Sequence, residues 1–365
     1  MGRDATTATT IEPAQIQAYL RHAGFPDAIV KSLAPLGQKT QEGLKGFGYG
    51  RPLRVSFASG GATRDLVVRT MSPDPFGHNR RSARAETLIL CFDTFNTFPG
   101  HIRATDIGAF TESGELLPMG RGEVFLVTEY VDGELYARDL SALQSAAAAT
   151  DRDRNRAVAL ARYLAALHSQ PAAPEEYGRA VRDLVGSGEG IFGLVDSYPK
   201  DLEIVPAARL RALEALVIDW RWRIKDRAHR ARRTHGDFHP FNLLFRDGVD
   251  FSVLDCSRGA AGEAADDVTC LSINYLFFAL TAHGKVDGPL LELWQLFWRT
   301  YLEASGDQEL LEVVPPFFAW RALVLASPVW YPQVENATRD RLLVFAERLL
   351  AGTRFEPARV AELFA

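Results

Sequence analysis

An asparagine and an aspartate stand at the two ends of a short hairpin that the sequence predicts. Residues 243–245 and 251–254 have the apolar composition of two strands, and the Asp-Gly pair at 247–248 between them is a strong hairpin signal. Folding about that pair brings Asn242, at the start of one strand, close to Asp255, at the end of the other. Amide and carboxylate oxygens are ligands that Mg²⁺ accepts when phosphates and water complete its octahedron. We therefore predict a metal site at Asn242 and Asp255.

A third polar side chain, Asp237, lies on the loop that enters this hairpin, five residues before Asn242. From there it could orient a substrate hydroxyl beside the metal and accept its proton. A loop aspartate, an asparagine five residues later and a second aspartate after a hairpin form the arrangement used in phosphoryl transfer. The spacing thus favours transfer of a γ-phosphoryl group to a hydroxyl, with Asp237 as the catalytic residue.

Residues 235–242 read His-Gly-Asp-Phe-His-Pro-Phe-Asn, which resembles the His-Gly-Asp-x-His-x-x-Asn loop of the aminoglycoside phosphotransferase and choline kinase family. That family usually follows its metal-binding aspartate with Gly-Asp-Pro-x-x-Asp, and residues 262–267 here read Gly-Glu-Ala-Ala-Asp-Asp. Glu263 and Ala264 depart from the pattern, as does Cys256 at an often aromatic position. The resemblance implies an α+β, bilobal protein-kinase-like fold, with a small antiparallel-sheet N-terminal lobe and a larger, mainly helical C-terminal lobe.

The pattern of the first third of the chain suits such a sheet. Residues 53–57 alternate apolar and polar side chains, Gly60-Gly61 makes a turn, and residues 66–69 return, after a weaker first strand at 32–36. This meander differs from the alternating strands and helices of a dinucleotide-binding domain. Residues 11–25 have helical spacing and are expected to pack on this lobe.

The change from strand period to helix period marks the boundary between the lobes. The apolar strand 124–131 runs into an Asp-Gly pair, and helical composition follows. We expect an N-terminal, nucleotide-binding lobe over 1–130 and a C-terminal lobe over 131–365. The second lobe would carry the catalytic loop 234–245 and the metal-binding loop 253–267.

The second lobe shows several helical patterns. Residues 155–169 are amphipathic, and His168 near their end is interpreted as a packed core histidine. Residues 210–233 are expected to be one long helix whose basic end is a solvated face. Residues 186–199 look like an irregular insert whose role is open. Further helices are expected at 268–282, 290–304, 317–326 and 338–350.

The resemblance also implies a set of nucleotide-binding residues. Arg69 stands where kinases carry a strand lysine that contacts the α- and β-phosphates, and Glu86 is either its helix partner or part of a solvated face. The backbone of Glu129 and Val131 would face the adenine. The glycine-rich stretch 37–50 either approaches the phosphates or is a flexible hairpin loop. ATP or GTP, with Mg²⁺, is the expected cofactor set.

Besides a kinase, the motif is compatible with two other kinds of protein. In the kinase interpretation His235 and His239 hold the loop, and Asp267 ties the following helix to it. The triplet His235, Asp237 and His239 could instead bind a transition metal in a hydrolase, although the hairpin would then be unexplained. A nucleotide-binding protein without turnover is the third possibility, which the arginine at position 69 favours slightly.

The composition excludes several classes of protein. A net charge of −5 disfavours general nucleic-acid binding, and three scattered cysteines support neither a disulfide framework nor a zinc knuckle. The N-terminus lacks an apolar leader, and the most apolar run, 271–280, is too short to cross a bilayer. We expect a cytoplasmic protein whose partner is a small hydroxyl compound, with neither nucleic acid nor membrane as a partner.

The sequence leaves the identity of that acceptor open. Acceptors in the family include aminoglycosides, macrolides, choline, homoserine and sugars. A cationic acceptor would need carboxylates near Asp237, and Glu263, Asp266 and the acids of the 186–201 segment are the candidates.

Overall fold

The computed structural model describes residues 11–364 except 37–49, 51, 73–77, 79–80, 112–113, 119–122 and 187. The glycine-rich stretch predicted to approach the phosphates therefore lies outside the described residues, apart from Gly50. The described residues divide into two compact units, unit 1 up to residue 132 and unit 2 from residue 133.

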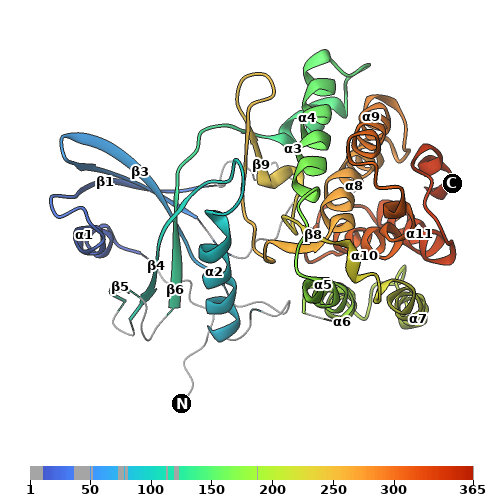
Figure 1. Cartoon of the computed structure of the whole chain (residues 1–365), viewed down its shortest axis with the longest axis horizontal. Coiled ribbons are helices and arrows are strands. Elements are labelled where there is room, and N and C mark those ends of the chain that lie inside the picture. The colour runs from blue at the N-terminus through green and yellow to red at the C-terminus, as the bar shows by residue number, and fades with distance from the viewer. Residues whose placement is uncertain are drawn as a thin grey trace. The chain divides into compact units, whose positions relative to one another are not determined.

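Unit 1 is built on a six-stranded antiparallel sheet with the strand order β1-β2-β3-β6-β4-β5 (Figure 1). Helix α1 packs against both edge strands, β1 and β5, so the sheet curls around it, while α2 packs on β4 and β6. The elements are α1 (Pro13–His22), β1 (Ile29–Pro35), β2 (Leu53–Ser59), β3 (Ala62–Arg69), α2 (Arg81–Phe95), β4 (Ala104–Phe110), β5 (Leu116–Pro118) and β6 (Glu123–Glu129).

The antiparallel meander expected from the sequence is confirmed. Val55 and Phe57 on β2 are fully buried and join Ile16 and Leu20 of α1 in the core of unit 1. Strand β3 pairs with β2 on one side and with β6 on the other, with Arg69 opposite Leu126. Alternate side chains of a strand face one side of the sheet, which is why the apolar alternation located these strands correctly.

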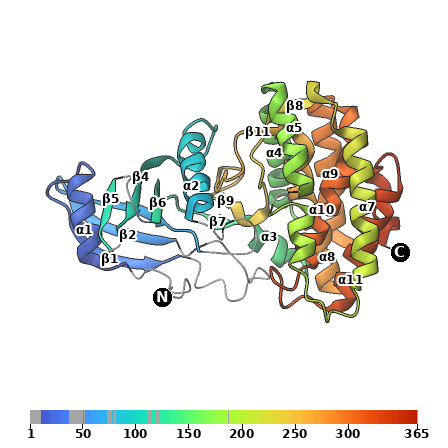
Figure 2. The same cartoon turned by 90° about the horizontal axis from the view of Figure 1, so that it is seen from below.

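Unit 2 is mainly helical (Figure 2). Its centre is α8, in which every residue from Ala264 to Leu280 except Asp266 is buried. A helix that is apolar all round must be surrounded by other elements, and α8 contacts α3, α4, α9 and α10. The helices are α3 (Tyr136–Leu143), α4 (Asp151–His168), α5 (Pro174–Gly186), α6 (Ile191–Asp196), α7 (Ala207–Ile224), α8 (Ala264–His283), α9 (Gly288–Ser305), α10 (Val314–Ala326) and α11 (Asn336–Ala351).

Two small sheets hold the motif segments of unit 2. One has the order β10-β9-β7 and the other pairs β11 with β8. The remaining elements are β7 (Glu134–Leu135), η2 (Ala228–Arg230), β8 (Ala231–Arg233), η3 (Pro240–Asn242), β9 (Leu243–Phe245), β10 (Phe251–Val253), β11 (Ala261–Glu263), η4 (Gln308–Glu312) and η5 (Pro357–Phe364).

The prediction of one helix over residues 210–233 was wrong for residues 225–233. Helix α7 ends at Ile224, and a 3₁₀ turn and strand β8 follow. The cause is Arg230, whose buried guanidinium donates to both carboxylate oxygens of Glu263 at 2.7 and 2.8 Å and to Asp307. A side chain held in this way cannot lie on a solvated helix face.

The insert predicted at 186–199 is only partly irregular, because it contains the short helix α6. Cys91, Cys256 and Cys270 are buried, and none of the three takes part in a disulfide bond. In the part of the chain that the structure describes, no helix combines the length and the apolar character needed to cross a membrane.

Candidate active site

The hairpin at the centre of the site is formed by β9 and β10 in unit 2. Val253 pairs with Leu243, and the next step of the ladder is a hydrogen bond from the Leu254 N–H to the Asn242 carbonyl, at 2.8 Å. Asp255 follows directly and has a left-handed backbone, with φ of 62°. The fold therefore places Asn242 and Asp255 at the same end of the hairpin.

The loop that carries Asp237 is fixed to the start of α8 by one carboxylate. Asp267 accepts hydrogen bonds from the backbone N–H groups of His235 and Gly236, both at 2.7 Å, and lies 3.0 Å from Nε2 of His168. Gly236 has a φ of +81°, and a Cβ atom there would lie 2.9 Å from Cβ of Arg258. Only glycine suits that position, and His168 is the hydrogen-bonded core histidine that we expected.

The Asp237 carboxylate is surrounded by two guanidinium groups and an imidazole ring. Arg321 Nη1 donates to its Oδ1 at 3.1 Å, Arg258 Nη2 lies 3.8 Å from the same oxygen, and His239 Nε2 lies 3.3 Å from Oδ2. Burial alone would raise the pKa of Asp237, but its interactions with His239, Arg258 and Arg321 outweigh burial and hold the pKa well below its usual value. Asp237 is therefore ionised throughout the neutral range.

Asn242 is oriented towards the same carboxylate. Its amide nitrogen donates to the Asp237 backbone carbonyl at 3.0 Å and lies 3.4 Å from Oδ2. Because the amide nitrogen of Asn242 points towards Asp237, its amide oxygen remains available to bind a metal. An amide oxygen is a hard ligand of the kind that Mg²⁺ binds. The residues at this end of the hairpin thus fit a magnesium ion.

A buried histidine connects the three acids of the motif. Burial lowers the pKa of His235, and the negative charges of Asp267, Asp237 and Asp255 act in the opposite direction. Its Nδ1 accepts the Asp237 N–H at 3.3 Å.

The transition-metal interpretation of the His235, Asp237 and His239 triplet finds no support. His239 uses Nδ1 to accept the Phe241 N–H at 3.1 Å, and His235 uses its own Nδ1 within the loop. Among the residues that the structure describes, no three His, Cys, Asp or Glu side chains are grouped to hold a metal ion.

Two arginines of the site were missed by the sequence analysis. Arg321 comes from α10 and Arg258 from the segment after Asp255, and both guanidinium groups lie over the Trp320 ring, at 4.0 and 4.4 Å from its centroid. Arg321 is 84 residues from Asp237 in sequence. Nothing in the helical pattern of α10 marks one arginine among its apolar residues.

Three of the acids expected to attract a cationic acceptor already lie against arginines. Glu263 is completely buried and binds Arg230, so its predicted role near Asp237 is wrong. Asp266 pairs with Arg321 at 2.5 Å, and Glu189 of the insert lies 3.4 Å from Arg258.

The residues predicted to bind the nucleotide lie in unit 1. Arg69 ends β3, and Glu129 ends β6, where its N–H donates to the Arg103 carbonyl at 2.8 Å. Val131 follows two residues later. Glu86 is exposed on α2. Their roles towards a nucleotide, including a pairing of Glu86 with Arg69, stay predictions.

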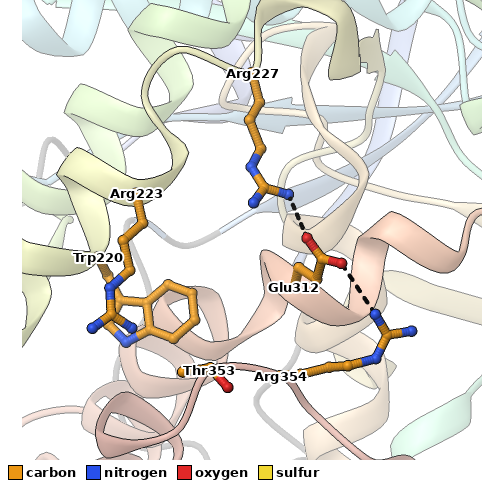
Figure 3. A pocket seen from close by; sticks show the side chains of 6 residues that line it. All are labelled: Trp220, Arg223, Arg227, Glu312, Thr353 and Arg354. Carbon is orange, nitrogen blue, oxygen red and sulfur yellow. Dashed lines mark hydrogen bonds and ion pairs between the residues drawn. The ribbon is translucent and has the colours of Figure 1, made fainter.

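A separate pocket of about 540 Å³ is formed by α7, η4 and the segment after α11 (Figure 3). Glu312 pairs there with Arg227 and Arg354, each at 3.1 Å, and Arg223 lies over the Trp220 ring. Its lining shares no residue with the contacts of Asp237. The charged groups that line it are largely paired with one another, so the pocket is not counted as part of the site.

A pH dependence of stability is expected from Asp266. Burial raises its pKa from 3.8 to about 6, against the opposing charges of Arg321 and Arg258. The folded protein then binds more protons than the unfolded chain between these two values, so the free energy of unfolding should fall as pH rises through that window. Asp266→Asn should lack this component. Urea unfolding from pH 4 to 7 tests it, and parallel curves for the two proteins would contradict it.

Comparisons with known proteins identify the family and the fold of this chain. A family model described as the phosphotransferase enzyme family matches residues 44–295. The solved GDP and kanamycin complex of APH(2")-IIia has a TM-score of 0.51 and 15% identity, covering 92% of this chain and 98% of that one. No curated protein matches the chain in sequence.

A second relative is represented by two solved structures of a thermostable mutant of aminoglycoside phosphotransferase APH(4)-Ia. The apo form has a TM-score of 0.50 and 15% identity, and covers 92% of this chain and 98% of that one. The ternary complex with AMP-PNP and hygromycin B has a TM-score of 0.50 and 16% identity, and covers 92% and 96%. These likenesses confirm the expected α+β, protein-kinase-like fold.

Proposed function

This chain belongs to the phosphotransferase enzyme family, and we propose that it transfers the γ-phosphoryl group of ATP or GTP to a hydroxyl group of a small molecule, with Mg²⁺ as the cofactor. The observation that carries this proposal is that Asn242 and Asp255 lie at the same end of the β9–β10 hairpin and that the Asn242 side chain donates to the Asp237 backbone carbonyl. The relatives named above were solved with GDP or AMP-PNP, which supports nucleotide use here.

In the proposed reaction Asp237 receives the acceptor hydroxyl. Its depressed pKa makes it a weak base, which suffices because the transition state of phosphoryl transfer is loose and the proton leaves late. His239 and Arg321 hold the carboxylate in place. Asn242 and Asp255 would hold Mg²⁺, which when bound offsets the charge that develops on the phosphates.

Unit 1 would supply the nucleotide contacts. We propose that Arg69 binds the phosphates as a planar fork and that the backbone of Glu129 and Val131 faces the base. A protein that binds nucleotide without turnover remains the alternative, and nothing in the arrangement of Asp237 favours it. Mg-ATP should raise the melting temperature in either case, and an assay for ADP release separates the two.

Substitution of the proposed metal ligand Asp255 should change the magnesium dependence of turnover. Asp255→Asn should raise the Mg²⁺ concentration for half-maximal turnover by about tenfold or more, because even residues that only orient metal ligands are worth tenfold or more in affinity. Asparagine also tolerates the left-handed backbone at this position. Turnover measured across a Mg²⁺ titration tests this, and excess EDTA should abolish turnover of the unmodified enzyme.

Asp250→Asn provides the matched control, since Asp250 is an exposed acid on the same hairpin whose partner is Arg246. Its magnesium dependence should equal that of the unmodified enzyme. Equal curves for Asp255→Asn and Asp250→Asn would remove Asp255 from the metal site.

A further inference from the structure

Helix α4 carries a buried arginine that holds the turn of the β9–β10 hairpin. Arg156 Nε donates to the Gly248 carbonyl at 2.9 Å, and Nη2 donates to the Arg246 carbonyl at 2.6 Å. Its guanidinium lies over the Phe245 ring, 4.2 Å from the centroid, and its remaining nitrogen pairs with Asp139 of α3. Only 1% of the Arg156 side chain is exposed. Since a guanidinium directs its donors within one plane, this side chain fixes the turn in both position and orientation.

The same helix contacts the catalytic loop and the second strand of the hairpin through Tyr163. Its ring stacks on Phe238, the residue after Asp237, with the ring centroids 5.6 Å apart. It also meets the Phe251 ring of β10 edge-on, at 5.3 Å between centroids. Arg156 and Tyr163 are seven residues apart, a spacing that places both on one face of a helix. One face of α4 therefore lies against both the hairpin and the loop that carries Asp237.

The C-terminal end of α4 is attached to the catalytic loop by a second route. His168, the last residue of the helix, lies 3.0 Å from Asp267, whose carboxylate accepts the N–H groups of His235 and Gly236. His168 and Arg156 are about 18 Å apart along the helix axis, at about 1.5 Å per residue. An α-helix keeps such a length fixed through its own backbone hydrogen bonds. Helix α4 thus determines the distance between the hairpin turn and the carboxylate that anchors the catalytic loop.

We propose that α4 sets the position of the metal ligands relative to Asp237, and that Arg156 is a positioning residue of the metal site. This rests on the proposed function, because it takes Asn242 and Asp255 as the residues that would hold Mg²⁺. Arg156 acts on them through the hairpin, since its hydrogen bonds are made to the turn and to Asp139. Strand β9 has only three residues, so a rotation of the turn would be transmitted to Asn242 at the other end of the strand.

The other contacts of the hairpin restrain its turn less strongly than Arg156 does. Arg246 pairs with Asp250, but Asp250 is 64% exposed, and solvent screens a pair of this kind so strongly that it adds little. Strand β7 pairs with β9 at Phe245 and Leu244, before the turn begins. The hydrogen bonds of Arg156, in contrast, reach the turn itself and are shielded from water. The orientation of the turn therefore depends mainly on Arg156.

The variant Arg156→Lys tests this role with a measurement that needs no acceptor. Lysine keeps a positive charge beside Asp139, but a single ammonium group cannot donate to both carbonyls in the plane that arginine uses. The quantity to measure is the dissociation constant of Mn²⁺ from the protein saturated with AMP-PNP, followed by electron paramagnetic resonance, since Mn²⁺ takes the same oxygen ligands as Mg²⁺. It should rise about tenfold, the lower end of what residues that orient metal ligands contribute. Asp255→Asn should raise the same constant, and the double variant should show less than the product of the two effects, because both act on one set of ligands.

Arg339→Lys is the matched control. Arg339 on α11 is 3% exposed and donates to the Ala326 and Tyr331 carbonyls at 2.8 and 2.7 Å, so it holds the segment that follows α10. Both substitutions should lower the melting temperature, because each leaves buried carbonyl groups without their donor. Only Arg156→Lys should weaken the binding of Mn²⁺.

An unchanged dissociation constant in Arg156→Lys, or an equal rise in Arg339→Lys, would overturn this inference. If Arg156→Lys does not fold, Tyr163→Leu takes its place, because it removes both ring contacts of Tyr163. It should also weaken Mn²⁺ binding, and an unchanged constant would again overturn the inference. The proposed function is judged separately by Asp255→Asn. If that variant binds Mn²⁺ as tightly as the unmodified protein does, the metal site itself is wrong and the proposed function fails with it.

Discussion

Replacement of Asp237 with alanine is expected to lower kcat by about 10²–10⁴-fold, the usual contribution of a positioned general base. Binding of Mg-ATP should be retained, because the nucleotide and the metal are proposed to be bound by other residues. The fold should also survive, since Arg321 keeps its pair with Asp266 when Asp237 is removed. Single-turnover kinetics and a nucleotide titration of the same preparation measure the two quantities.

Two further variants make this experiment decisive. Asp237→Asn keeps the shape of the side chain and its contact with Arg321, yet it cannot accept a proton, so its kcat should be close to that of the alanine variant. Asp250→Ala, at an exposed position of the same hairpin, should behave as the unmodified enzyme. Wild-type turnover by Asp237→Ala would show that Asp237 has been assigned the wrong role.

Asp267→Ala should have the largest effect on stability. Removing this fully buried carboxylate leaves two backbone N–H groups of the catalytic loop and the His168 ring without their acceptor. Breaking a buried charged network of this kind costs about 3–5 kcal/mol. In a unit of this size that corresponds to a fall of about 10 °C in melting temperature. Calorimetry in the absence of nucleotide measures it.

The control for this variant is Asp287→Ala. Asp287 precedes α9, is exposed and makes no capping hydrogen bond with its side chain. Its removal should change the free energy of unfolding by no more than about 0.5 kcal/mol. A similar small change for Asp267→Ala would mean that the catalytic loop is held by other contacts.

The parts of the site that the sequence predicted depend on residues that are close together in the chain. Asn242 and Asp255 are joined by a tight turn, and an Asp-Gly pair between apolar runs determines that turn almost alone. The strands of unit 1 were located by their apolar alternation and the helices of unit 2 by their spacing. Each of these signals depends on neighbours within one or two turns of the chain.

The parts that the sequence did not predict depend on distant contacts. Arg321 reaches Asp237 only because α10 packs on α8, and no local pattern reports that packing. The end of α7 was predicted wrongly for the same reason. The helical preference of residues 225–233 is outweighed by the buried ion pair between Arg230 and Glu263. That pair also explains why glutamate replaces the family's aspartate at this position. The longer side chain reaches Arg230 while also accepting the Ala265 N–H at the start of α8.

Two requirements conflict at residue 255. Its left-handed backbone favours glycine, whereas the proposed metal site needs a carboxylate. A glycine there would adopt the same φ without steric cost, whereas aspartate keeps the conformation only because the surrounding chain enforces it. Selection for heat resistance alone would therefore drive this position towards glycine. The aspartate at this position therefore makes the hairpin less stable than glycine would, and it supplies a carboxylate at the hairpin's end.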